Sequence, residues 1–197
     1  MTVTINGTSG VVCPAGGTVN VAGSGVGTTD IQTLTNKTIN GGAITSGTAQ
    51  ATTSGTAVGF TGIPSWVKRI TFQLVGVYNS SGTVATNVIQ IGSGSYVTTG
   101  YTSAYAYFSN STPISAATTN GFVLYGNTVS FGLYGNIILT LANASTNTWV
   151  ASGTACMNNT FNSTNGSISL SGVLDRIQIT ATSGAFSGGS VNILYEG

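Results

Sequence analysis

Beyond residue 56, β-branched and aromatic residues alternate with polar residues in short runs, and clusters of Gly, Asn and Ser separate these runs. An alternation of period two is typical of a strand with one buried face, and such clusters are typical of turns. The pattern predicts strands at 57–61, 66–77, 86–93, 103–109, 121–125, 129–143, 147–156, 167–171, 174–181 and 190–196. No stretch has a helical period, so we expect an all-β, antiparallel, jelly-roll-like sandwich.

Two of these runs show the alternation clearly. In RITFQL, the apolar residues Ile70, Phe72 and Leu74 alternate with polar ones, and in LDRIQIT the same holds for Ile177 and Ile179. Successive side chains of a strand point to opposite faces of its sheet. These five residues are therefore predicted to face the core.

The first 56 residues differ from the rest of the chain. They contain no aromatic residue, and short alternating stretches such as TVTING and GTVNVAG stand between Gly-rich turns. Such a segment cannot bury a core of its own. We therefore expect an extended N-terminal attachment arm, residues 1–56, before a head domain, residues 57–197. The apolar side of the arm needs a partner surface, either a capsid or tail protein or the same segment in sister subunits.

Charge is scarce throughout the chain. Only 4% of the 197 residues are charged, His is absent and the formal net charge is +1. Nucleic acid and anionic lipid surfaces both require clustered Lys and Arg, so neither is expected as a partner. No apolar run reaches the roughly 20 residues of a membrane span, so membrane insertion is not expected. A surface kept soluble by hydroxyls and amides suits a rigid assembled particle.

The acid–base groups are too few for ordinary catalysis. The carboxylates are Asp30, Asp175 and Glu196, and the chain offers no His beside them. General acid–base catalysis and metal binding need several such groups in one pocket. The sequence therefore predicts a protein that is not an enzyme and holds no cofactor or metal. Cys13 and Cys156 show no metal-ligand spacing, so we expect two buried free thiols.

The remaining charges suggest a structural role. Lys68 and Arg69 are adjacent at the start of one predicted strand, Asp175 and Arg176 are adjacent on another, and Glu196 ends the last strand. We expect inter-strand or inter-subunit ion pairs among them, which would set the register of strands or subunits. Exposed pairs contribute only about 0–1 kcal/mol each.

The stretch YTSAYAYFS carries the sharpest candidate for binding. Strand alternation places Tyr101, Tyr105 and Tyr107 on one face, with Ser103 between them. Tyrosines at this spacing line a core or a subunit interface, or they stack on the sugar rings of a glycan. From the sequence, both interpretations stay open: a core or interface role, and contact with a glycan.

Several stretches together resemble a β-sandwich module of tailed-bacteriophage virion surface proteins, namely GIPSWVKRITFQLVGV, IQIGSGSYVTTGY, LDRIQIT and GSVNILYEG. The stretches TVTINGTSGV and IQTLTNKTINGG are similar to the attachment and stalk regions of phage fibre-like proteins. The resemblance implies a non-enzymatic virion component, usually a homotrimer, displayed on the particle surface after assembly in the host bacterial cytoplasm.

The length of the segment before the head bears on which of two roles we expect. Only about 56 residues precede the head, without a long repeat array, which favours a capsid decoration (cement) protein anchored by its N-terminal arm. The alternative is a receptor-binding tail fibre or short fibre tip that recognises a host surface glycan. A homotrimer would also cover strand edges that carry little charge to prevent edge pairing.

Overall fold

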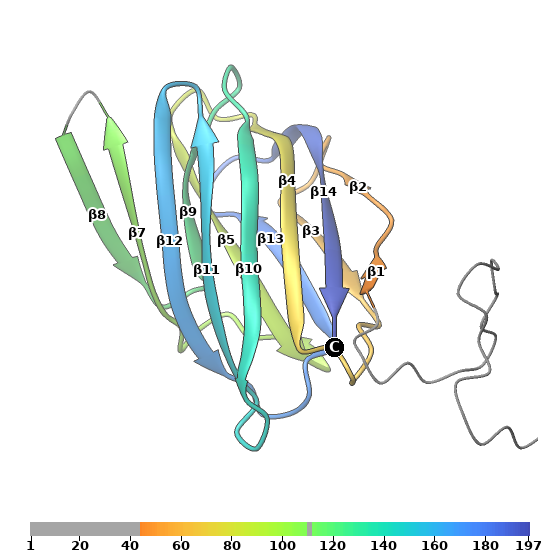
Figure 1. Ribbon diagram of the computed structural model, residues 1–197. Coiled ribbons are helices and arrows are strands. Elements are labelled where there is room, and N and C mark those ends of the chain that lie inside the picture. The colour runs from red at the N-terminus through yellow and green to blue at the C-terminus, as the bar shows by residue number, and fades with distance from the viewer. Residues whose placement is uncertain (1–43, 110–111) are drawn as a thin grey trace, which may run out of the picture. The chain divides into compact units, whose positions relative to one another are not determined.

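The computed structural model describes residues 44–109 and 112–197, and every regular element in these residues is a β-strand. All strand pairs are antiparallel. The strands form two sheets that lie face to face (Figure 1). The all-β, antiparallel part of the predicted fold is thereby confirmed, and the arrangement is sandwich-like.

The larger sheet has nine strands and the smaller has five. The larger contains, in spatial order, β1 (Ile44–Ser46), β14 (Phe186–Glu196), β4 (Arg69–Asn79), β10 (Leu133–Asn143), β11 (Thr148–Met157), β12 (Thr160–Ser169), β7 (Thr102–Ser109) and β8 (Thr112–Thr118), and β2 (Gln50–Ala51) also pairs with β14. The smaller contains β3 (Ala57–Thr61), β13 (Arg176–Ala181), β5 (Ala85–Ser93) and β6 (Ser95–Tyr96), and β9 (Phe122–Asn127) also pairs with β5.

The core lies between the two sheets and is built as the alternation predicts. Ile70, Phe72 and Leu74 of β4 are buried, and so are Ile177 and Ile179 of β13 on the opposing sheet. Polar residues between them face outward. The predicted inward-facing positions of both strands are therefore confirmed.

Most predicted strands are present, but two begin three or more residues later than predicted. Residues 64–67 form a turn before β4, in which the Val67 N–H donates to the Pro64 carbonyl at 3.1 Å. Residues 129–132 also precede their strand, because the Thr128 hydroxyl accepts from the N–H groups of Ser130 and Phe131, each at 3.1 Å. A hydroxyl that bonds nearby backbone groups replaces ladder hydrogen bonds with a turn.

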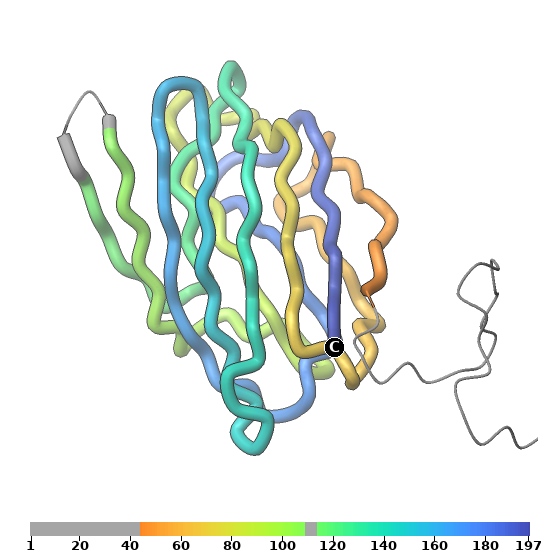
Figure 2. Tube along the Cα trace, viewed as in Figure 1, coloured from red at the N-terminus to blue at the C-terminus, as the bar shows by residue number. Residues whose placement is uncertain are grey.

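Strand prediction from alternation failed for β8 and for most of β12. The inward face of β12 carries Asn162 and Thr164, both fully buried, so its pattern shows no apolar alternation. In β8, Ile114 and Ala116 are exposed although they point toward the side of the core. Figures 1 and 2 show the reason for β8: it lies at the edge of the larger sheet and extends beyond β9, so the described strands of the smaller sheet do not cover it. The short strands β2 and β6 were also not predicted, whereas β1 lies in an alternating stretch of the predicted arm.

Most of the predicted arm, residues 1–56, lies outside the described residues. Its last part, residues 44–56, pairs with the larger sheet through β1 and β2. Thr52 is fully buried there, and its hydroxyl donates to the Gly188 carbonyl at 2.8 Å. These residues therefore contribute to the edge of the sandwich beside β14.

Candidate functional site

The described part of the sandwich has two unlike ends. At one end, which we call the charged end, β4 and β13 begin and β14 terminates, and all five charged residues of the described chain lie there: Lys68, Arg69, Asp175, Arg176 and Glu196. The opposite end, the uncharged end, contains the loops at 80–84 and 128–132 and the turn between β11 and β12. Strand β1 also begins at the charged end, because Ile44 pairs with Glu196.

At the charged end, an ion pair joins β4 and β14, two neighbouring strands near the β1 edge of the larger sheet. Arg69 of β4 lies opposite Glu196 of β14, and Arg69 Nη1 is 3.6 Å from Glu196 Oε2. The Lys68 N–H donates to the Glu196 carbonyl at 2.7 Å, and the Leu141 N–H donates to the Lys68 carbonyl at 2.8 Å. The strand ends are thus held in register mainly by backbone bonds. Within the described residues, the Lys68 side chain has no ion-pair partner.

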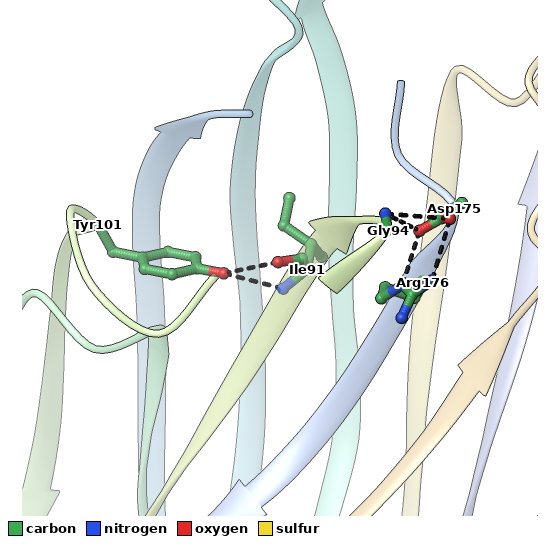
Figure 3. Close-up of polar contacts among 5 residues, drawn as sticks. All are labelled: Ile91, Gly94, Tyr101, Asp175 and Arg176. Carbon is green, nitrogen blue, oxygen red and sulfur yellow. Dashed lines mark hydrogen bonds and ion pairs between the residues drawn. The ribbon is translucent and has the colours of Figure 1, made fainter. Parts of the chain in front are cut away.

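Asp175 and Arg176 form a second polar cluster at the same end (Figure 3). Arg176 donates to both carboxylate oxygens of Asp175, at 2.8 and 3.2 Å, and the Gly94 N–H donates to the same carboxylate at 3.1 and 3.2 Å. Arg176, followed by the Gly94 N–H, lowers the pKa of the Asp175 carboxyl. The Arg176 guanidinium also lies over the Tyr96 ring at 5.7 Å. Asp175 therefore fastens the turn between β5 and β6, and it pairs with its neighbour instead of Arg69.

Tyr101 is a core residue. Its side chain is 2% exposed, and its phenol accepts from the Ile91 N–H at 2.8 Å and lies 3.1 Å from the Val97 carbonyl (Figure 3). Burial raises the pKa of this phenol to about 12. The ring also packs edge-on against Phe122 at 5.1 Å. Tyr101 thus anchors the loop after β5, and no face of its ring is available to a sugar.

Tyr105 and Tyr107 lie together on the inward face of β7, and Tyr125 of β9 joins them. The rings of Tyr107 and Tyr125 are parallel within 5° at a centroid distance of 3.7 Å, and Tyr105 stacks 5.6 Å from Tyr125. Tyr107 is buried, whereas the other two are partly exposed. Burial, then the neighbouring Tyr107, raises the pKa of Tyr125 to about 12. Sequence reasoning missed Tyr125, because it belongs to another sheet and stands alone in its strand.

The outer face of the larger sheet carries a row of apolar side chains near the uncharged end, which we call the apolar row. It consists of Val75, Tyr134, Cys156, Phe161 and Phe108, which are successive Cα partners on β4, β10, β11, β12 and β7. All five are exposed. The predicted burial of Cys156 is therefore wrong, because its position in β11 faces outward. Cys13 lies outside the described residues.

The charged residues of the described chain do not form an acid–base or metal centre. Asp175 is held by Arg176 and Glu196 faces Arg69, while Asp30 lies outside the described residues. Within residues 44–109 and 112–197, no group of three His, Cys, Asp or Glu side chains could hold a metal ion. None of the described elements is a helix with the length and apolar character of a membrane span.

A pocket of about 430 Å³ lies at the opposite edge of the sandwich from β8. Residues 46–50 line one side, and Gly59, Phe60 and Thr61 of β3 line the other. Its lining is largely backbone, hydroxyl and amide groups. Such a lining can accept hydrogen bonds from a small polar ligand but supplies no general acid or base.

Comparisons of the chain with protein-family models, with curated proteins and with solved structures found no match.

Proposed function

We propose that this chain is a non-enzymatic structural protein of a bacteriophage virion, a homotrimeric capsid decoration protein on the particle surface. In this proposal, the sandwich is a jelly-roll-like head, and the N-terminal arm anchors it to the shell. The observation that carries the proposal is the difference between the two ends. The chain before Ile44 joins the head at the charged end, while the uncharged end presents apolar side chains.

The composition of the surface supports an assembled state. A protein with few charges has little electrostatic repulsion between copies, which suits permanent packing on a particle. The polar contacts at the charged end hold the strand ends in place, as a head that must stay rigid requires. The resemblance of several stretches to phage surface proteins points in the same direction.

A receptor-binding tail fibre or short fibre tip is the second candidate function. The partial exposure of Tyr105 and Tyr125 favours it, because an accessible aromatic face can stack on a sugar ring. Glycan-array binding that is lost in Tyr105→Ala, and retained in Tyr195→Ala at the charged end, would support this role. An array without any bound glycan would count against it.

Immunogold electron microscopy of intact particles tests the location. Particles of the phage that encodes this chain would be labelled with antibodies against residues 57–197. We expect gold over the capsid. Label confined to the tail would replace decoration by the fibre role, and unlabelled particles from cells that express the protein would overturn both.

A further inference from the structure

The apolar row is a contiguous stripe, although its residues are far apart in the sequence. Directly opposed residues on antiparallel strands have Cβ atoms about 5 Å apart and project from the same face. Five adjacent strands at a spacing of about 4.8 Å extend the stripe over roughly 20 Å. Phe108, Phe161 and Tyr134 are 54%, 50% and 46% exposed, and Val75 is 58% exposed.

The exposed apolar area falls in the range of the largest patch on a typical monomeric protein, about 300–600 Å², and such patches are often functional. Because an aromatic side chain buries about 150–250 Å², three half-exposed aromatic rings and Val75 expose on the order of 400 Å². Val84, Val129 and Phe131 are also exposed, in loops of the uncharged end, and are not counted in this area. A standard interface buries about 800 Å² per partner, a little over half of it apolar. The area is close to the apolar share of one such interface.

The charge pattern identifies the kind of partner. No charged residue of the described chain lies at the uncharged end. A charged group of a partner would therefore lose its hydration there without meeting an opposite charge. A second copy of this chain presents a surface of the same uncharged type. The five charged residues, at the opposite end, do not oppose such a contact.

We propose that the apolar row is the surface through which this chain packs against a second copy of itself. The proposal deepens the proposed homotrimer and rests on it only for the number of copies. In the assembly, Phe108, Phe161 and Tyr134 are covered, and the Cys156 thiol between them is shielded from solvent.

The test uses the full chain with Cys13→Ser, so that Cys156 is the only thiol. Light scattering over a dilution series gives the association constant, and the rate of reaction with N-ethylmaleimide gives the exposure of Cys156. Phe161→Asp is compared with Val150→Asp, which places the same charge on the outer face of β11 at the charged end, where Val150 is 40% exposed. Phe161→Thr provides a milder variant, and circular dichroism checks that all variants fold.

We expect Phe161→Asp to weaken association at least tenfold, with a smaller effect of Phe161→Thr and little effect of Val150→Asp. Alkylation of Cys156 should accelerate in Phe161→Thr, because this variant adds no negative charge beside the thiol. If the chain is oligomeric but Cys156 reacts equally fast in all variants, the row is not the interface, although the homotrimer stands. A chain that is monomeric at every concentration overturns both proposals. An intrachain Cys13–Cys156 disulfide in oxidised wild-type monomer would show that residues 1–43 cover the row, and it would overturn this proposal too.

Discussion

The polar groups at the charged end and the apolar groups at the uncharged end differ in what they contact. At the charged end, Asp175, Arg69 and the phenol of Tyr101 bond to backbone groups or charges of neighbouring elements. At the uncharged end, the outward side chains of the apolar row lie beside one another, and the Tyr134 phenol also has the Tyr78 phenol as a hydrogen-bond partner. The two ends therefore differ in charge and polar pairing, and both expose apolar side chains: Ile44, Trp66 and Val173 at the charged end and the apolar row near the uncharged end.

The largest contrast is expected between neighbouring residues of β7 near the uncharged end. Tyr107→Ala removes a buried ring from the tyrosine stack and should destabilise the fold by about 3–5 kcal/mol. Phe108→Ala, on the exposed face of the same strand, should cost less than about 1 kcal/mol. Urea unfolding at protein concentrations too low for association measures both. Equal losses would show that the outer face is already covered within one chain.

The second-largest effect is expected at alkaline pH, where the free energy of unfolding should fall because of Tyr101 at the charged end. The pKa of Tyr101 is raised from 10.0 to about 12 in the folded chain, so its contribution is fully present below pH 10 and is lost as the pH rises toward 12. Two pKa units correspond to roughly 3 kcal/mol. Tyr101→Phe should make the alkaline loss of stability shallower, and the other tyrosines whose pKa is raised, Tyr125 among them, should contribute to what remains. An unchanged slope would contradict the burial of this phenol.

The same Tyr→Phe change at the two ends should have different costs. Tyr101→Phe leaves the buried Ile91 N–H without its acceptor, which should lower stability at neutral pH by about 1–3 kcal/mol. Tyr134→Phe, in the apolar row, should change it by less than about 0.5 kcal/mol. Thermal unfolding followed by circular dichroism compares them. A greater loss for Tyr134→Phe would reverse the distinction between the ends.

Arg69→Ala should have a small effect. Its ion pair with Glu196 is 3.6 Å long, and the side chains are 46% and 30% exposed, so the pair contributes about 0–1 kcal/mol. The difference from wild type should shrink further in high salt, because ions screen exposed charges. A loss above about 2 kcal/mol would mean that Arg69 is covered in the assembly, so that the charged end would also be a contact surface.

Acid should produce the smallest change. Because Arg176 and the Gly94 N–H lower the folded pKa of Asp175 below its ordinary 3.8, the stabilisation is present above that ordinary value and is lost as the pH falls through the folded value. Asp175→Asn should therefore reduce the acid sensitivity of unfolding while keeping the fold. An acid profile identical to wild type would show that the cluster does not contribute.

The sequence by itself determined the all-β class, most of the strands and the inward faces of β4 and β13. Alternation is a local property, and burial of one pleat face follows from it directly. Adjacent charges at strand ends were also visible in the sequence, and Arg69 and Glu196 are partners in the structure. The tyrosine spacing correctly placed Tyr105 and Tyr107 on one face.

Tertiary structure alone decided the rest. The sequence of β12 is polar because Asn162 and Thr164 point inward. The sequence of β8 shows no alternation, and the described strands of the smaller sheet do not cover it. Tyr125 reaches the tyrosine stack only because β9 of the smaller sheet faces β7. The residues of the apolar row stand singly on five strands, and only the register between those strands makes them neighbours. Register is a long-range property, set by how the two sheets close over one core, and local alternation does not contain it.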